Sequence, residues 1–538
     1  MATHACLLPC ATRAVQGLLS TSHCHPAPLV RILFTSAHQQ AAAAAQLQAN
    51  QPSIQYAPPL QPYIKAVPAP AKFRPATHPA AQGAYSLGPF QPLPFDDPRQ
   101  AFQSKSSTKL LQSLAVFQAC SLKPLVKNAD SVLAVARQVA GTRLVNSAIK
   151  HTVFQHFCAG EDEETIKPTL RYLQQNGILP IINYAAEADV PGAAEGEESS
   201  LSGCVEDACD DNMRVFLQSV EEAAKVDGRG FTAIKITALG QPALLESISS
   251  AFTASHLGTD RGRWSVDLRG CAAKHLNTEQ LAAFDAMMHR THTIAAAAAA
   301  QPNVRLMVDA EQTYMQPAID AITIHLQQLH NRGRVVILNT YQCYLKDTRT
   351  RIMTDIQRAR REGWRFGAKF VRGAYMHQER DIAHQQGVPS PVHDTAQDTH
   401  DNYNRCVAEA LALVRSEQLE LMVASHNQES VDKATCLMHH LSLRPGADGV
   451  YFGQLLGMSD HLSFTLGLHG YRAYKVIPYG PVQETIQYLI RRARENSDIM
   501  GGVGKETRMI RAELWRRFTQ ALRGSIRPAV SPEPAAVM

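Results

Sequence analysis

The stretch Phe366-Gly-Ala-Lys-Phe-Val-Arg-Gly-Ala-Tyr375 joins a short apolar run to two cations and a turn of small residues. An extended backbone would place Lys369 and Arg372 on opposite faces, so that each cation has its own direction. A strand end of this kind can grip an anionic cofactor, but solvated charges at a strand end give the same pattern. Similar runs elsewhere in the chain are needed to decide between the two interpretations.

Seven other apolar or β-branched runs complete a set of eight predicted strands: 178–184, 231–239, 304–311, 335–342, 421–427, 450–457 and 474–480. Segments with helical periodicity lie between them, among them 318–329, 353–362, 403–416 and 431–441. Strands that alternate with helices predict a parallel sheet. Eight such units favour a closed α/β barrel of the (β/α)8 type over an open doubly wound sheet.

Polar residues collect where these predicted strands end, as at Lys235, Asp309, Glu311, Asn339, Gln342, Arg372, Ser425-His-Asn427 and Gln454. In a parallel barrel the carboxyl ends of the strands surround the active site. Lys235 lies inside a strand pattern, where a buried ammonium needs an anion or a water-filled mouth, unless the strand is simply at an edge. Asp309 is a better catalytic candidate than Glu311, which can instead cap the following helix.

Arg491 and Arg492 lie on a predicted helix, and Glu495 has the spacing to hold one of the two guanidiniums. Two adjacent cations can flank a carboxylate from two directions, although such a pair is more often a solvated helix face.

His426 is either a metal ligand or a cofactor contact. Because it has no partner at ligand spacing, we predict no metal site. No Gly-x-Gly-x-x-Gly motif opens a helix, so a Rossmann dinucleotide site is not expected.

The charge of the 538-residue chain is concentrated in its first 95 residues, which hold five basic residues and no acidic one, while the whole chain has a net charge of +5. We interpret residues 1–100 as an organelle transit peptide and a disordered spacer, with a plain disordered tail as the alternative. The nearly neutral remainder argues against a nucleic-acid partner. The eleven cysteines include no Cys-x-x-Cys pair, which favours a reducing compartment.

The expected order of segments is a leading helical region at 101–175, a barrel at 176–528 and a disordered tail at 529–538. The leading region contains an apolar stripe formed by Val132, Val135 and Val139. The acidic insertion 187–211 is predicted to be a mobile loop. No run is long and apolar enough to span a bilayer, so any membrane contact is expected to be peripheral.

Seven motifs in one order carry a resemblance to a known family: Ala233-Ile-Lys-Ile-Thr-Ala-Leu-Gly240, Arg305-Leu-Met-Val-Asp-Ala-Glu-Gln-Thr-Tyr314, Asn339-Thr-Tyr-Gln-Cys-Tyr-Leu-Lys-Asp347, Gly367 to Tyr375, Val423-Ala-Ser-His-Asn427, Tyr451-Phe-Gly-Gln-Leu-Leu-Gly-Met458 and Arg491-Arg-Ala-Arg-Glu-Asn496. From about residue 157 to about residue 523 the chain resembles the eukaryotic mitochondrial proline dehydrogenase (proline oxidase) family. The resemblance implies a distorted eight-fold barrel that holds FAD non-covalently at the strand carboxyl ends. It also implies hydride transfer from C5 of L-proline to flavin N5, which gives pyrroline-5-carboxylate, and electron transfer to ubiquinone on the matrix side of the inner mitochondrial membrane.

The resemblance assigns roles to residues of this chain. Lys235, Arg491 and Arg492, with Glu495 behind them, would bind the proline carboxylate, and Leu455 would pack on the substrate ring. Asp309 and Tyr375 would line the catalytic site, and Lys369 would lie beside the reactive edge of the flavin. The remaining expected FAD contacts are Ala310, Asn339, Arg372, Gly373, Ala374, Ser425, His426 and Asn427.

One position departs from the family pattern. Val476 stands where many members have a Tyr beside C4 of the substrate, and where hydroxyproline dehydrogenases have a smaller polar residue. Tyr474 would replace that Tyr only if the strand register were shifted. A hydroxyproline dehydrogenase on the same scaffold is therefore an alternative, and a barrel lyase with Lys235 as a Schiff-base nucleophile is another.

Overall fold

The computed structural model describes residues 91–184, 202–254, 267–498 and 500–525. The predicted transit peptide and spacer lie outside these ranges except for residues 91–100, and the tail 529–538 lies wholly outside them. The insertion predicted as a loop is described only from residue 202 onwards. There the prediction was wrong, because residues 202–211 form the first turns of helix α9, Ser202–Ala224.

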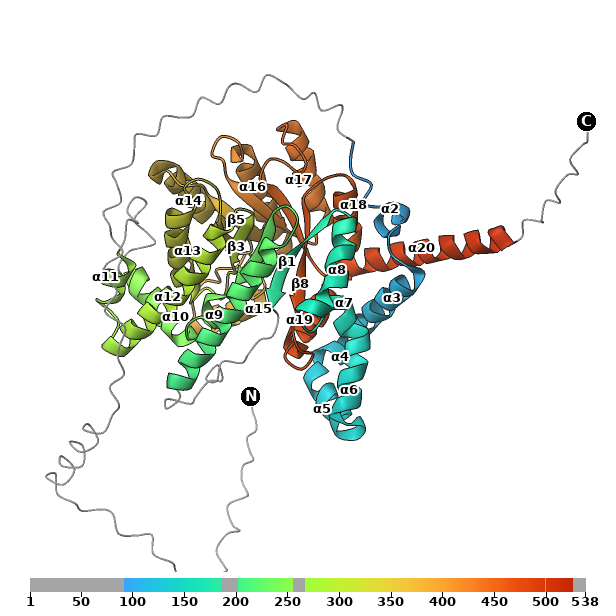
Figure 1. The fold of residues 1–538 in the computed structure, drawn as a ribbon, viewed down its shortest axis with the longest axis horizontal. Coiled ribbons are helices and arrows are strands. Elements are labelled where there is room, and N and C mark those ends of the chain that lie inside the picture. Colours follow the sequence, from blue (N-terminus) through green and yellow to red (C-terminus); the bar gives the residue numbers. More distant parts are fainter. Residues whose placement is uncertain (1–90, 185–201, 255–266, 499, 526–538) are drawn as a thin grey trace, which may run out of the picture. The chain divides into compact units, whose positions relative to one another are not determined.

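Eight parallel strands close into a barrel in chain order, with β1 paired to β8, so the predicted fold class is confirmed (Figure 1). The strands are β1 Ile178–Tyr184, β2 Gly230–Ile234, β3 Val304–Val308, β4 Ile337–Gln342, β5 Gly367–Val371, β6 Glu420–Ala424, β7 Val450–Leu455 and β8 Ala473–Tyr479.

Most predicted strands were too long at their carboxyl ends. β2 stops at Ile234, and Lys235 begins a single 3₁₀ turn, η2, Ile236–Ala238. β3 stops at Val308, although the Asp309 N–H still donates to the Ile234 carbonyl at 2.9 Å. Lys235 and Asp309 therefore lie in loops directly above the barrel, where side chains are not restricted to two faces.

Helices cover the outside of the barrel between the strands. They are α8 Glu163–Gln175 before β1, α9 after it, α10 Pro242–Ala254, α11 Leu268–Ala272, α12 Thr278–Ala300, α13 Gln316–His330, α14 Thr348–Glu362, α15 Met376–Gln386, α16 Ala396–Leu413, α17 Gln428–His440 and α18 Asp460–Leu468. Capping boxes begin α8, α12 and α16, with Asp162, Asn277 and Thr395 as the N-cap residues. These side chains satisfy backbone N–H groups that the first helical turn leaves unpaired.

Short helices at the N-terminal end of the described chain pack against its C-terminal helices. The former are α2 Pro98–Phe102, α3 Ser107–Ser121, α4 Lys123–Lys127, α5 Ala129–Ala140, α6 Thr142–Ile149, η1 Lys150–Phe154 and α7 Gln155–Phe157, and the latter are α19 Ile486–Asp498 and α20 Met500–Ser525. Phe102 and Phe117 share a buried cluster with Met509 and Ile510 of α20. The chain thus closes on itself beside the barrel.

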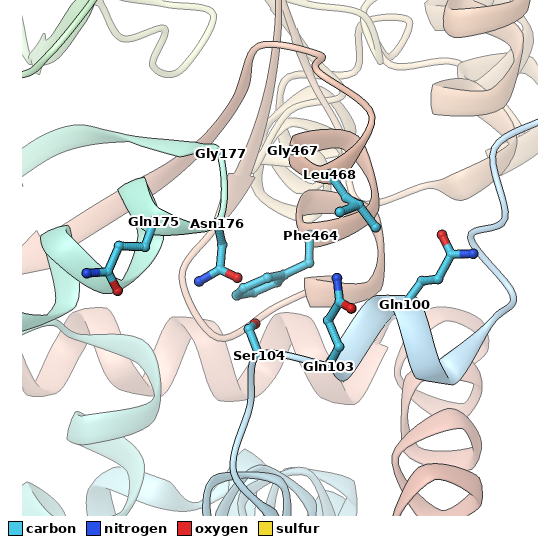
Figure 2. A pocket seen from close by; sticks show the side chains of 9 residues that line it. All are labelled: Gln100, Gln103, Ser104, Gln175, Asn176, Gly177, Phe464, Gly467 and Leu468. Atoms are coloured by element: carbon cyan, nitrogen blue, oxygen red, sulfur yellow. The ribbon is translucent and has the colours of Figure 1, made fainter.

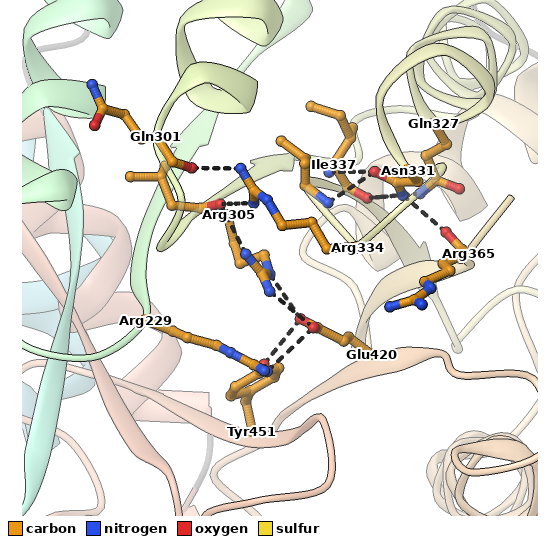
Figure 3. A network of polar contacts seen from close by, with 12 residues as sticks. Arg229, Gln301, Arg305, Gln327, Asn331, Arg334, Ile337, Arg365, Glu420 and Tyr451 are labelled. Atoms are coloured by element: carbon orange, nitrogen blue, oxygen red, sulfur yellow. Dashed lines mark hydrogen bonds and ion pairs between the residues drawn. The ribbon is translucent and has the colours of Figure 1, made fainter. Parts of the chain in front are cut away.

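A buried ionic network fills the interior at the amino ends of the strands (Figure 3). Arg305 of β3 donates to both carboxylate oxygens of Glu420 on β6, at 2.8 and 3.0 Å. The Tyr451 hydroxyl donates to the same carboxylate at 2.9 Å, and Arg229 pairs with it at 3.2 Å. Glu420 and Arg305 are both buried. This network closes the floor of the barrel, so only the opposite end is available for a site that opens to solvent.

Candidate active site

An ion pair across the mouth of the barrel joins β5 to the loop that follows β3. Lys369 of β5 lies within 2.5 Å of Asp309, which follows β3, and the two side chains remain 15% and 28% exposed. Lys369 points inward because Ala368 and Phe370, its neighbours in β5, pack into the core outside the barrel. The structure therefore brings together two of the three predicted catalytic residues at the carboxyl ends of the strands.

Glu311 does not cap the following helix, which was the alternative role suggested by the sequence. Its two carboxylate oxygens each accept from the Thr237 hydroxyl at 2.9 Å, and its own N–H donates to Gln316 of α13 at 2.8 Å. Burial raises the pKa of Glu311, while the Thr237 hydrogen bonds and the nearby charge of Lys235 oppose that rise. Glu311 thus ties the loop after β2, which carries Lys235, to the loop after β3.

Arg372 is the centre of a hydrogen-bonded cluster beside the mouth. Its guanidinium donates to His400 at 2.9 Å and to the hydroxyls of Ser425 and Ser430 at 2.8 Å each. Its central carbon lies 4.2 Å from the centroid of the Tyr403 ring. Arg372 therefore fixes the end of β5 against β6, α16 and α17, and burial lowers its pKa.

The turn Gly373-Ala374 exposes its backbone directly beyond that cluster. Gly373 has a φ of +127°, and a Cβ added to it would lie 1.4 Å from the Tyr344 ring. A residue with a side chain cannot take its place without moving that ring. The turn leaves its backbone groups accessible to solvent at the mouth. Tyr375 follows the turn as the N-cap residue of α15.

His426 lies on the other side of the mouth, in the loop after β6. Its Nδ1 lies 3.1 Å from the Ser459 hydroxyl. Burial lowers the pKa of His426 to about 3, and the positive charges of Lys475 and Arg492 lower it further. The imidazole is therefore neutral at physiological pH, and Arg492 of α19 is near enough to act on it electrostatically. Asn427 caps α17 through Ser430, at 3.0 Å.

Leu455 and Val476 lie side by side at the end of the barrel that carries the mouth. They are register partners across β7 and β8, and Val476 belongs to the apolar cluster inside the barrel. Leu455 also packs against the cluster that contains Tyr488 and Leu489 of α19. Helix α19, which carries Arg491 and Arg492, therefore lies next to these two side chains. The side chain of Glu495 is outside the described residues.

Three side chains that the sequence had placed near the mouth face elsewhere. Asn339 is fully buried on the outer face of β4 and donates to Asp320 of α13 at 3.0 Å. Gln454 also faces outward and accepts from Ser463 of α18 at 2.9 Å. Tyr474 points to the floor, where its hydroxyl donates to the Arg229 carbonyl at 2.9 Å, so no register shift brings it to the substrate. The geometry thus gives no support for an Asn339–flavin contact.

Gln342, rather than Asn339, lies on the inner face at the end of β4, in phase with the buried interior residue Leu338. It is buried, and its side-chain oxygen has no hydrogen-bond partner among the described residues. A buried acceptor without a partner is costly unless a bound molecule supplies a donor. The sequence pattern contained this residue, but the phase of the strand was needed to choose it.

Comparison with protein-family models gives one match, the model of proline dehydrogenase, over residues 166–505. The chain belongs to the proline dehydrogenase family. It is 34% identical to human mitochondrial proline dehydrogenase 1, over 82% of this chain and 93% of the human one. It is 37% identical to bovine hydroxyproline dehydrogenase, over 80% of this chain and 95% of that protein. The protein is thus an enzyme of the proline dehydrogenase type, which leaves the Schiff-base lyase alternative without support.

A solved structure of proline utilization A from Bdellovibrio bacteriovorus is similar in fold to this member of the proline dehydrogenase family. The TM-score is 0.53 at 18% sequence identity, and the match covers 74% of this chain and 38% of the bacterial one. At this identity the comparison supports the barrel architecture alone.

A pocket of about 320 Å³ lies away from the mouth, among α2, α8 and α18 (Figure 2). None of the residues that line it has an ionisable side chain. The lining residues are Gln100, Gln103, Ser104, Gln175, Asn176, Gly177, Phe464, Gly467 and Leu468. Such a pocket offers no counter-charge for the carboxylate of an amino acid. The mouth, with Lys235, Lys369 and the nearby Arg492 of α19, is therefore the candidate active site of this proline dehydrogenase family member, and Arg491 is exposed on the same helix.

A buried charge cluster behind the mouth was missed by the sequence reasoning. Lys475 of β8 is fully buried and pairs with Asp460 at 2.8 Å, while it donates to the Met458 carbonyl at 2.5 Å. Glu506 of α20 accepts the N–H groups of Ser459 and Asp460 at 2.9 Å each. The cluster fixes the loop that follows Leu455. The argument applied to Lys235, an ammonium within a strand pattern, also applies to Lys475 and could have found it.

The stability of the protein is expected to fall as the pH is lowered from about 6.5 to about 4. Burial lowers the pKa of four histidines. The value falls to about 4 for His156, His292 and His461 and to about 3 for His426. These groups stay neutral in the folded protein in this range but take up protons when it unfolds. Each contributes a loss of about 1.4 kcal/mol per pH unit in the free energy of unfolding.

Two carboxyls partly offset this loss. Burial raises the pKa of Asp355 and of Glu506 to about 7, so below that pH the folded protein holds protons that the unfolded chain releases. Near pH 5 the net slope of these six groups is then about two protons, or about 3 kcal/mol per pH unit. Urea unfolding at pH 4.5 and pH 5.5 measures it, and His292→Gln, which lies away from the mouth, should reduce the slope by about one proton. A stability that is flat over this range would contradict the argument.

Proposed function

We propose that the protein is an FAD-dependent proline dehydrogenase that oxidises L-proline to pyrroline-5-carboxylate and passes the electrons to ubiquinone. The observation that carries the proposal is the collection of cations at the mouth of the barrel in a chain of the proline dehydrogenase family. Its relatives named above as mitochondrial support a mitochondrial location. We place the protein on the matrix side of the inner membrane, in peripheral contact with it. No helix among the described residues is long and apolar enough to cross a membrane.

The residues at the mouth fit an FAD. Gly373 and Ala374 are both exposed, so their backbone N–H groups would be accessible to a phosphate chain. Arg372 is held firmly enough to act as a fixed cation, Gln342 offers an unpaired buried acceptor, and His426 offers a neutral imidazole. Ala310, Ser425 and Asn427 complete the proposed cofactor side. When bound, FAD would supply the acceptor for the hydride from C5 of proline.

The opposite side of the mouth would hold the substrate. Arg491, Arg492 and Lys235 provide positive charge for its carboxylate, and charge-assisted hydrogen bonds from guanidiniums are both strong and directional. Leu455 and Val476 offer an apolar surface on which the ring can lie. That surface also excludes water from the reacting carbon. The Lys369–Asp309 pair and Tyr375 would close the site, with Lys369 positioned to stabilise negative charge that develops on the oxidant.

A hydroxyproline dehydrogenase is the second candidate, favoured by Val476 and by the 37% identity to the bovine enzyme of that name. Valine is smaller than tyrosine and leaves room at C4 of the ring. It offers no hydrogen-bond partner, however, so a buried 4-hydroxyl would lose its contacts with water without replacement. We therefore assign proline as the preferred substrate.

The test is the visible spectrum of the purified protein before and after substrate is added in the absence of oxygen. We expect a flavin spectrum that L-proline bleaches, with a kcat/KM at least about tenfold higher than that for trans-4-hydroxyproline. D-proline, which presents its carboxylate on the other side of the ring, is the matched control and should act slowly. A colourless protein would overturn the assignment, and a preference for hydroxyproline would favour the second candidate.

A further inference from the structure

We propose that helices α4–α6, residues 122–149, form a docking surface for an anionic lipid membrane, and we call this segment the arm. The inference rests on the proposed function in one respect, namely that the electron acceptor is dissolved in a membrane. The arm lies outside the barrel and beyond the residues matched by the family model.

The arm presents apolar side chains to solvent to an unusual degree. Helix α5 buries none of its residues. Of the fourteen exposed large apolar side chains in the described part of the chain, six belong to the arm: Leu122, Leu125, Val132, Val135, Val139 and Leu144. The three valines lie three and four positions apart and so form one stripe along α5, with Val139 83% exposed. The sequence predicted this stripe, but the structure places no core against it.

The arm as a whole carries a positive net charge, although Arg137 of α5 faces away from the stripe and donates to Asn146 of α6 at 3.4 Å. Lys123, Lys127, Arg137 and Arg143 belong to the arm, and none of them pairs with a carboxylate among the described residues. The single acidic residue of the arm, Asp130, pairs with Arg494 of α19 at 3.1 Å. Exposed apolar side chains bordered by cations are typical of helices that lie in the interface of an anionic membrane, where lysine stems extend toward the headgroups.

The same charges argue against a second copy of the chain as the occupant. Two-fold association through the arm would bring like charges of both copies together, whereas an anionic surface neutralises them. The arm is short, with twelve residues in α5 and eight in α6, so it can lie on a bilayer but not cross it.

The arm is attached to the helix that carries the proposed substrate arginines. Asp130 at the start of α5 contacts Arg494 and also accepts from Gln487 at 3.4 Å, and α4 packs beside α19 (Figure 1). Asp130 and the valine stripe lie on opposite faces of α5, so one face of the helix is held against α19 and the other is left for the membrane.

The test measures binding of the full chain to vesicles, without substrate, so that it does not depend on the proposed activity. Vesicles containing cardiolipin should bind the protein, while vesicles of phosphatidylcholine alone should bind it at least about tenfold more weakly. Val135→Glu/Val139→Glu should reduce binding to the anionic vesicles at least about tenfold. Both side chains are exposed, so the fold and the activity with a soluble dye acceptor should stay unchanged.

Two matched variants make the result specific. Leu329→Glu/Val388→Glu changes exposed apolar residues elsewhere and should leave vesicle binding unchanged. Trp515→Glu/Phe518→Glu changes the other exposed apolar stripe, on α20, and should also have little effect. The proposal is overturned if the arm variant binds as the unchanged protein does, if the α20 variant alone loses binding, or if the unchanged protein ignores anionic vesicles. It is also overturned if the arm variant converts a dimer to a monomer.

Discussion

Replacement of Glu420 by alanine is expected to lower the free energy of unfolding by about 3–5 kcal/mol. Glu420 is the only carboxylate that the described residues offer to Arg305, whose side chain is 4% exposed. Without Glu420, the guanidinium stays buried with no counter-charge, and the Tyr451 hydroxyl loses its acceptor. Equilibrium unfolding in urea measures the loss.

The matched control is Glu409→Ala. Glu409 also accepts three hydrogen bonds from one arginine, Arg349, at 2.8, 3.0 and 3.0 Å, but that arginine side chain is 47% exposed. Removal of the Glu409 carboxylate should lower the free energy of unfolding by less than about 1 kcal/mol, because water can hydrogen-bond to the exposed Arg349 guanidinium in its place. A double variant, Arg305→Met/Glu420→Leu, removes both buried charges and should recover much of the stability that Glu420→Ala loses. Equal losses in Glu420→Ala and Glu409→Ala would show that burial of the floor network does not determine its strength.

The barrel could be predicted because its signal is repeated and local. Each strand is a short apolar run, each helix has its own periodicity, and eight alternations leave few other arrangements. The ends of the strands could not be predicted as well. Lys235 and Asp309 continue the apolar–polar pattern of β2 and β3, so periodicity alone cannot show where the ladder hydrogen bonds stop.

The choice between Asn339 and Gln342 shows why part of the site was misassigned. Both are polar residues near the end of one predicted strand, and the two positions point to opposite faces. A shift of one residue in the assumed phase exchanges inside and outside. Only the register of β4 against β5, in which Asn339 pairs with Ala368, fixes the phase.

Contacts between distant segments had no sequence signal at all. Glu506 caps α18 from a helix more than forty residues later, at separations of 46 and 47 positions. The valine stripe on α5 shows the opposite situation, in which the sequence signal is present but the contact is not. An amphipathic pattern indicates that a helix has an apolar face, but it does not identify what packs against that face.

Replacement of Arg491 and Arg492 by alanine is expected to lower kcat/KM for L-proline by about 10³-fold or more, while the flavin that we propose stays bound. The loss follows from the mode of recognition that we propose, because one charge-assisted pair to a bound carboxylate is worth about 2–5 kcal/mol in a desolvated site. Arg492 is near enough to the mouth for this role. Its guanidinium lies 5.1 Å from the centroid of the Tyr488 ring, and its charge lowers the pKa of His426 across the mouth.

The matched control lies on the same helix. Arg494→Ala removes an exposed guanidinium that pairs with Asp130, so it should change kcat/KM less than about threefold. Arg491→Lys and Arg492→Lys separate charge from geometry, since lysine keeps the charge but lacks the two-pronged donor that matches a carboxylate. A large increase in KM with a retained flavin spectrum would place the arginines at the substrate. If the double alanine variant oxidises proline normally, the carboxylate must be bound elsewhere, and the remaining cations of the mouth, Lys235 and Lys369, become the residues to replace.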